Sequence, residues 1–199
     1  MFPSSTYINR RQALKKSVDS GILLFLGNEE SPMNYLHNTF HFRQDSSFLY
    51  FFGLNYPSLA AIIDIDEDRE IIFGVDLTVE DIVWMGTQPT LLDRGQAYGI
   101  KDLQPTSQLA KYIANAEAKG RKVHFLPPYR PENKIKLLNL LNIHPNQVAE
   151  KASTEMVLGV VNLRNYKTDE EVAEIVRAVD TSVDMHVAAM KLAKAGMKE

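Results

Sequence analysis

The chain has 199 residues, 45% hydrophobic and 24% charged, which is typical of a globular protein with a core of its own. Its formal net charge of −3 argues against a general binder of nucleic acids or anionic membranes, because basic surfaces hold polyanions. The absence of cysteine excludes disulfides, thiolate zinc sites and cysteine nucleophiles. No apolar run has the length of a signal peptide or a membrane span, so we expect a cytoplasmic protein.

The first part of the sequence predicts an α/β opening. Residues 5–20 have helical apolar spacing, with Ser5 or Thr6 as N-cap and Gly21 as the end. The continuous apolar run 22–26 is typical of a strand that is buried on both faces. We expect the basic side chains of the helix to form a solvated face; they are Arg10, Arg11, Lys15 and Lys16.

Residues 28–41 predict an irregular loop, which leads into residues 40–54, a stretch with six aromatic side chains. Arg43 and Asp45 lie between aromatic residues and are costly to bury unpaired, so we expect each to have a fixed partner. One interpretation is a structural polar bridge at the start of a short helix, capped by Asp45 or Ser46. Its inward-facing residues would be Phe48, Leu49, Phe51 and Phe52. The other is an active-site pair, but no nucleophile or metal ligand lies beside it.

The middle of the chain predicts a mixed sheet. Residues 59–65 and 70–75, separated by an acidic turn, indicate a β-hairpin. Residues 78–85 indicate a short helix with Thr78 as N-cap, and residues 106–119 a second helix, starting at Thr106 or Ser107. Residues 123–126 then predict a short strand.

The last part of the sequence is mainly helical. We interpret the proline-rich residues 127–131 as a connector rather than a docking motif, followed by a helix over 132–141 and a short element over 153–163. Thr168 and Glu171 form a capping box, from which one long helix of roughly 40 Å extends to Gly196. Its apolar face consists of Val172, Ile175, Val176, Val179, Val183, Val187 and Met190.

Few residues have the spacing that catalysis needs. His37 and His41 could share a helix face as metal ligands, but their loop composition favours surface or loop histidines, and there is no HExxH motif. The acidic pairs Asp64/Asp66 and Glu80/Asp81 fall in turns and first helical turns, where carboxylates are common without a catalytic role. The sequence therefore predicts no catalytic residue and no metal ligand in this chain.

Residues 42–53 resemble the central signature of the N-terminal domain of the aminopeptidase P family, in the creatinase and prolidase group of metallopeptidases. The matching positions are Phe42, Arg43, Gln44, Asp45, Ser46, Phe48, Tyr50 and Gly53. The start and end of the long helix resemble the first helix of the family's catalytic domain. These positions are Lys167, Thr168, Glu170, Glu171, Ala173, Gly196, Met197 and Glu199.

The resemblance implies an α/β fold with three layers, in which helices flank a mixed sheet, plus a long C-terminal helix. Residues 1–164 would form the N-terminal domain. Residues 165–199 would form a linker and the first helix of a truncated pita-bread catalytic domain.

The intact enzyme of this family is an Xaa-Pro aminopeptidase, which releases the residue that precedes proline at a peptide's N-terminus. Two divalent metals, commonly manganese, would be bound downstream of this chain. The chain itself would provide oligomer contacts, in a homodimer or higher oligomer, and a wall of the active-site cleft. Its partners would be its own missing catalytic domain and further copies, with a peptide as substrate. A prolidase and a stand-alone interaction module without catalysis stay open as alternatives.

The resemblance also points to two cleft-rim residues. The segment from Trp84 to Gly86 is similar to the family segment that reaches such a cleft, and Tyr56 is a weaker candidate. Trp84 is the only tryptophan of the chain, and a sole tryptophan is more often a core residue than a contact residue. On that ground we expect Trp84 in the core, with the rim position as the alternative.

Overall fold

The computed structural model describes residues 2–198, which divide into two compact units at residues 163 and 164. The first unit contains a five-stranded mixed sheet with the strand order β6-β5-β4-β1-β7. The strands are β1 (Ile22–Leu26), β4 (Ala60–Asp64), β5 (Arg69–Gly74), β6 (Asp102–Pro105) and β7 (Val123–Phe125). The pairs β1/β4 and β4/β5 are antiparallel, and β1/β7 and β5/β6 are parallel.

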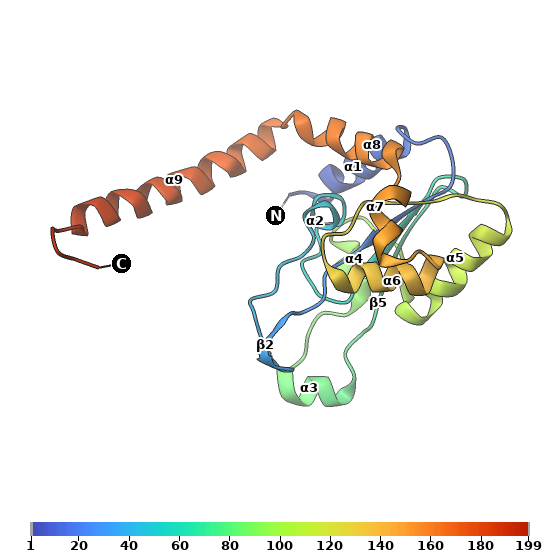
Figure 1. Cartoon of the computed structure of the whole chain (residues 1–199), viewed down its shortest axis with the longest axis horizontal. Coiled ribbons are helices and arrows are strands. Elements are labelled where there is room, and N and C mark those ends of the chain that lie inside the picture. Colours follow the sequence, from blue (N-terminus) through green and yellow to red (C-terminus); the bar gives the residue numbers. More distant parts are fainter. Residues whose placement is uncertain (1, 199) are drawn as a thin grey trace. The chain divides into compact units, whose positions relative to one another are not determined.

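Helices lie on both faces of this sheet (Figure 1). Their bounds are α1 (Ser4–Lys15), α2 (Ser46–Phe52), α3 (Val79–Met85), α4 (Leu91–Gln96), α5 (Leu109–Ala118), α6 (Pro131–Leu141), α7 (Val148–Lys151) and α8 (Thr154–Asn165). Two 3₁₀ turns, η1 (Thr106–Gln108) and η2 (Pro145–Gln147), and a small hairpin of β2 (Pro32–Tyr35) and β3 (Asn38–Thr39) complete the unit.

The central strand β1 explains the three layers. Leu23 and Phe25 point to a core formed with α1, α2 and α8, whereas Ile22 and Leu24 point to a second core with α5 and α6. A strand with helices on both faces must be apolar on both, which accounts for its continuous apolar run. The predicted three-layer fold with a mixed sheet is confirmed.

Helix α1 differs from the sequence prediction in its ends and in its basic face. It begins after Pro3 without a side-chain cap and ends at Lys15, so the predicted caps Ser5 and Thr6 are wrong. Arg10 and Arg11 are buried rather than solvated, and the side chain of Arg11 is 0% exposed. The reason is position, because Arg11 lies four residues after Tyr7 on the helix face that packs on the core.

Helix α2 is built as predicted, with one exception. The carboxylate of Asp45 caps it by accepting from the amides of Ser47 and Phe48, and Gly53 ends it with a φ of 71° that suits glycine. Phe48, Phe51 and Phe52 are fully buried; each contributes about 1.5–3 kcal/mol through its apolar surface. Leu49 is 40% exposed, so its predicted place in the core is wrong.

Most other predicted elements of the first unit are present. The hairpin over 59–75, the helices after Thr78 and η1, the strand β7, and helices α6 and α8 agree with the prediction. The prediction lacks the hairpin β2/β3 inside the expected loop, helix α4, strand β6, and the short η2 and α7 between α6 and α8. Strand β6 has alternating polar residues at a sheet edge, so it lacks the apolar run that identifies a buried strand.

The second unit consists mainly of α9 (Asp169–Leu192), a helix of 24 residues and therefore about 36 Å long. The predicted capping box is present, since Thr168 and Glu171 bond to each other's backbone amides. The helix ends before the predicted Gly196, which instead takes a φ of 89° in a following turn. Its apolar stripe is exposed, and Glu199 lies outside the described residues.

Within residues 2–198, no helix combines the length and the apolar composition that crossing a lipid bilayer requires.

Candidate functional site

The signature segment is organised around Gln44, which is buried. Its Oε1 accepts hydrogen bonds from the amides of Asn28 (2.8 Å) and Asp45 (2.9 Å), and its Nε2 donates to the carbonyl of Tyr56 (2.8 Å). A buried side-chain amide must have partners, and here these bonds join the end of β1 to both ends of α2. Gln44 therefore holds the segment in place.

The sequence predicts that Arg43 is buried with a fixed partner, and the structure does not bear this out. Arg43 is exposed, and its backbone carbonyl accepts from Asn28 Nδ2 (2.9 Å). Asp45 acts as the N-cap of α2, as predicted. The structural interpretation of this segment holds for Asp45, and the buried arginine expected here is found elsewhere in the fold.

The remaining signature residues lie on α2 or next to its ends. Phe48 and Gly53 are buried, Phe42 and Tyr50 are partly buried, and Ser46 is exposed. Adding a Cβ to Gly53 would bring it within 2.2 Å of the Tyr98 ring, so the position needs glycine.

Arg10 and Arg11 supply the buried charges next to this segment. Arg11 donates to Glu70 (2.7 Å) and to the carbonyls of Phe51 (2.9 Å) and Tyr98 (3.1 Å). Burial lowers the pKa of Arg11, and the ion pair with Glu70 opposes this effect. Arg10 lies 3.9 Å from the centre of the Tyr50 ring and donates to the Tyr50 carbonyl (2.8 Å). Both arginines thus fix α1 to the signature helix.

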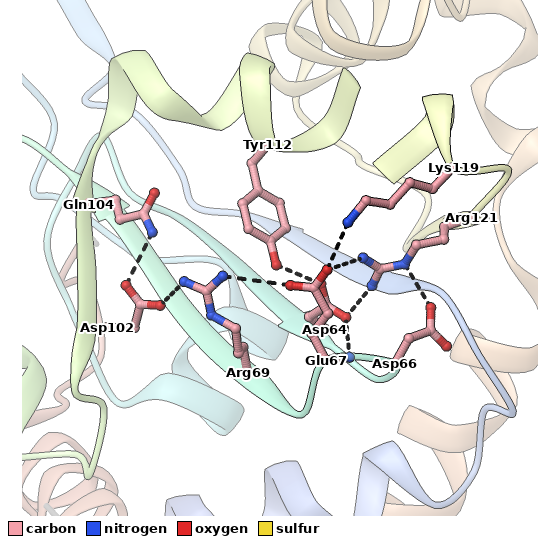
Figure 2. Close-up of polar contacts among 9 residues, drawn as sticks. All are labelled: Asp64, Asp66, Glu67, Arg69, Asp102, Gln104, Tyr112, Lys119 and Arg121. Carbon is pink, nitrogen blue, oxygen red and sulfur yellow. Dashed lines mark hydrogen bonds and ion pairs between the residues drawn. The ribbon is translucent and has the colours of Figure 1, made fainter. Parts of the chain in front are cut away.

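A second polar network joins the turn after β4 to α5 and β6 (Figure 2). Asp64 is fully buried and accepts from Tyr112 and Arg121, and Arg121 also donates to Asp66 (2.7 Å). Burial raises the pKa of Tyr112, and its hydrogen bond to the Asp64 carboxylate raises it further. Because cationic and hydroxyl groups occupy these carboxylates, the network is a structural joint rather than an open acid/base site.

The histidines do not form a metal site. His37 and His41 are exposed, which agrees with the surface interpretation. His124 is buried between Ser153 (2.7 Å from Nδ1) and the carbonyl of Ser20 (3.1 Å from Nε2). Burial lowers its pKa. Among the described residues, no group of three or more histidine, aspartate or glutamate side chains could hold a metal ion.

Trp84 lies on α3 and is 82% exposed, so its expected place in the core is wrong. Helix α3 is fixed by a capping box between Thr78 and Asp81, and these hydrogen bonds lower the pKa of Asp81. Three further apolar side chains of α3 face solvent: Val79 is 80%, Val83 76% and Ile82 38% exposed. The capping box satisfies the first amides of the helix, but the side chains of Val79, Val83 and Trp84 have no core to pack on.

Tyr56 lies at the base of the segment that carries α3. It lines a small pocket with Asp76 and Leu91, which flank α3 in the sequence, and the guanidinium of Arg94 stacks 3.8 Å from its ring centre. Tyr56 is partly buried, whereas Trp84 lies further out on the helix. The structure thus connects both predicted rim residues to one segment, residues 75–94.

A further exposed apolar group lies on the hairpin β2/β3. Its members are Met33, Tyr35, Leu36 and Phe40. Figure 1 shows β2 and α3 at the same lower end of the sheet domain. We call these side chains together with Val79, Ile82, Val83 and Trp84 the apolar arm. Large exposed apolar patches mark interaction surfaces in folded proteins, and both segments carry exposed apolar side chains.

Sequence reasoning missed the structural roles of four residues around the sheet: Arg11, Asp64, Arg94 and Arg121. The signal for Arg11 is its spacing, because Tyr7, Arg11 and Leu14 share one face of α1. The signal for Asp64 is an acidic residue directly after the buried run 60–63. The stacking of Arg94 on Tyr56 and the pairing of Arg121 with Asp64 have no local signal, since both join residues that are distant in the sequence.

The fold and the site define a class of protein: a three-layer α/β domain with an exposed apolar arm. Residues 7–124 match the family model described as aminopeptidase P, N-terminal domain. The match covers more than half of the chain, and the chain belongs to this family.

Similar proteins extend this assignment. Human Xaa-Pro dipeptidase is 24% identical over 195 residues, which span 92% of this chain and 37% of the human protein. A probable Xaa-Pro aminopeptidase of Aspergillus niger is 24% identical over 162 residues, or 80% of this chain and 33% of its own length. The chain therefore spans about a third of the length of these relatives.

Solved structures share the fold. A histidine-to-alanine variant of Escherichia coli aminopeptidase P aligns with a TM-score of 0.79 and 19% identity, covering 98% of this chain and 46% of that one. Aminopeptidase PepP of Pseudomonas aeruginosa aligns with a TM-score of 0.78, 20% identity and the same coverages. One of the E. coli structures is described as zinc-substituted and bound to product.

Proposed function

We propose that this chain is the N-terminal, non-catalytic part of an Xaa-Pro aminopeptidase, whose intact form releases the N-terminal residue preceding proline. The observation that carries the proposal is the family match over residues 7–124, in a chain that covers 46% of solved aminopeptidase P structures. Residues 1–164 are then the N-terminal domain, and residues 165–199 a linker and the first helix of the catalytic domain.

The exposed stripe on α9 supports the assignment of the second unit. A capped 24-residue helix with one apolar face needs a surface to pack on, because helix propensity alone gives marginal stability. Val172, Ile175, Val176 and Val179 are each about half exposed. In this proposal the rest of the catalytic domain covers them.

The apolar arm contributes the wall of the active-site cleft. Trp84 is highly exposed on a capped helix, which suits a side chain that contacts a partner surface or a peptide. Tyr56 stacks against Arg94 at the base of residues 75–94 and holds this segment in position. The same apolar side chains supply oligomer contacts, in a dimer or a higher oligomer.

The two divalent metals of the intact enzyme, with manganese as the expected ion, do not fit this chain. Its described residues contain no cluster of ligands, and cationic partners occupy the carboxylates around Asp64. No catalytic step is assigned to residues 1–199. The metal ligands belong to the part of the enzyme that follows, and the cytoplasmic location stays a prediction from the sequence.

The test is to read the gene beyond Glu199 and to express the extended chain. We expect the reading frame to continue into aspartate, histidine and glutamate ligands, and the extended chain to hydrolyse an Xaa-Pro peptide with manganese. In that enzyme W84A should lower kcat/KM about tenfold, whereas W84F should restore most of it. A stop codon directly after Glu199 would contradict the proposal and favour a stand-alone interaction module.

Prolidase is the second candidate, since human Xaa-Pro dipeptidase aligns over 92% of this chain. The two activities differ in substrate length, because a prolidase acts on dipeptides that end in proline. Assaying the extended chain with an Xaa-Pro dipeptide and an Xaa-Pro tripeptide separates them. We expect the tripeptide to be cleaved, and exclusive cleavage of the dipeptide would assign the chain to a prolidase.

A further inference from the structure

A buried histidine joins three segments of the first unit. His124, in β7, is 2% exposed. Its Nε2 lies 3.1 Å from the carbonyl oxygen of Ser20, in the turn between α1 and β1, and its Nδ1 lies 2.7 Å from the hydroxyl of Ser153. Ser153 directly precedes α8, and its hydroxyl caps that helix by accepting from the amide of Met156 (3.2 Å). The ring therefore connects the sheet to the start of α8.

The two contacts of the ring determine which of its nitrogens carries hydrogen. A carbonyl oxygen can only accept, so the hydrogen is on Nε2 and points to Ser20. The neutral Nδ1 then has a lone pair, which accepts the hydroxyl hydrogen of Ser153. This arrangement satisfies both nitrogens only while the ring is neutral, because a hydrogen on Nδ1 would face a hydroxyl that already donates there.

The charged groups around the ring have other partners. Glu155 Oε2 lies 3.3 Å from Nδ1, but this side chain is 56% exposed and pairs with Lys122 (3.0 Å). Asp66, in the turn after β4, pairs with Arg121 (2.7 Å). The charges on the turn before β1 and on α7 are exposed; they are Lys16, Asp19, Glu150 and Lys151. Burial therefore outweighs these groups and lowers the pKa of His124.

The two sides of the ring are held differently. On the Ser20 side, three backbone amides fix the turn, namely those of Gly21, Ile22 and Ile65. On the α8 side, Ser153 is held by the ring and by one bond from its amide to the carbonyl of Phe125 (3.1 Å). From Gly159 onwards α8 packs closely on α1. The start of α8 is thus the side that can open, and the opening is confined to its first turn.

We propose that His124 is a pH-sensitive joint: when Nδ1 takes up a proton, Ser153 leaves the ring and the first turn of α8 opens. The imidazolium then reaches water and the carboxylate of Glu155. Helix α8 leads along the chain from the first unit into the second, so acidic solution loosens the start of this connecting helix. The joint is defined by contacts within the first unit and does not depend on the proposed function.

Native-state hydrogen exchange of the 199-residue chain tests this joint, followed by ¹H–¹⁵N NMR from pH 7.5 to 5. The readout is the protection of the Ser153 and Met156 amides, corrected for the intrinsic exchange rate. We expect it to be constant above about pH 6.5 and to fall below that by up to about tenfold per pH unit. Low urea concentrations should leave this protection unchanged, because a local opening exposes little surface.

The ring supplies a second measurement. Long-range ¹H–¹⁵N spectra should show the hydrogen of His124 on Nε2 at pH 7.5, and the ring should titrate below about pH 6.5. A hydrogen on Nδ1 at pH 7.5, or titration at a higher pH, would overturn the proposal, since the hydroxyl of Ser153 would then not be the donor.

Variants separate the joint from general effects of acid. H124Q takes up no proton in this range, so the protection of both amides should not depend on pH. H144Q is the matched control, because His144 is exposed and its replacement should leave the native pH dependence.

Three results of the exchange experiment would each contradict the joint. They are constant protection in the native chain, an equal fall in H124Q, and protection that decreases steeply with urea, which would indicate global unfolding. If H124Q fails to fold, the pH series of the native chain and the titration of the ring still decide between the outcomes.

Discussion

Helices α2 and α3 are both seven residues long, both rich in apolar side chains and both capped at the N-terminus by a side chain, yet their surroundings are opposite. In α2 the three phenylalanines are fully buried, whereas in α3 the side chains of Val79, Val83 and Trp84 face solvent. Capping and apolar composition therefore determine that a helix forms, but not whether it packs. The comparison assigns α2 to the stability of the domain, whereas α3 carries the exposed side chains of the proposed contact surface.

The largest expected difference between the two helices is in stability. F52A removes a fully buried ring and should lower the free energy of unfolding by about 3–5 kcal/mol. W84A removes an exposed ring and should change it by less than about 0.5 kcal/mol. Urea denaturation of both variants measures this, and equal losses would contradict the distinction between core and arm.

A slightly smaller effect is expected for the buried charge next to α2. R11M leaves Glu70 and the carbonyls of Phe51 and Tyr98 without their donor, and should cost about 3 kcal/mol. The matched control is R43M, since Arg43 belongs to the signature but is exposed; its cost should stay below about 0.5 kcal/mol. Urea denaturation measures the free energy of unfolding of both variants. A larger decrease in R43M than in R11M would show that Arg43, rather than Arg11, stabilises the domain.

The smallest of these stability effects depends on pH. Burial lowers the pKa of His124 below the ordinary value of about 6.5, so the unfolded chain takes up the proton first as the pH falls. The charged groups around it are Lys122, Glu155 and Asp66. Stability is therefore fully present above about pH 6.5 and decreases below it, by up to about 1.4 kcal/mol per pH unit.

The control for this effect is H124Q, which cannot be protonated. The difference in unfolding free energy between the native chain and H124Q, measured by urea denaturation, should change with pH between about 6.5 and 5. A constant difference would show that the pKa of His124 is the same in the folded and the unfolded chain, so that burial does not lower it.

The sequence predicts more of the fold than of the contact surface. Strand β1 and the phenylalanines of α2 are readable because their apolar patterns report burial directly. Strand β6 and helix α4 are short and polar, so only tertiary contacts define them. Trp84 is misjudged because its hydrophobicity indicates burial of some kind, and the pattern does not distinguish a core from a partner.

Electrostatic contacts between distant residues are also not predictable from local sequence patterns. The sequence places a fixed arginine at Arg43, but the structure uses Arg11, 32 positions earlier, because the helix face of Tyr7 and Leu14 points it at Glu70. The pairing of Asp64 with Arg121 also joins residues 57 positions apart. Such pairs follow from the sheet order, which local patterns do not contain.

The most direct test of the exposed arm uses the fluorescence of Trp84, the only tryptophan of the chain. Because its side chain is 82% exposed, the native chain at low concentration should emit as a solvated tryptophan, be quenched readily by acrylamide, and change little when unfolded in urea. A blue-shifted emission that is protected from acrylamide and moves to longer wavelength on unfolding would place Trp84 in a core and contradict its assignment to a contact surface.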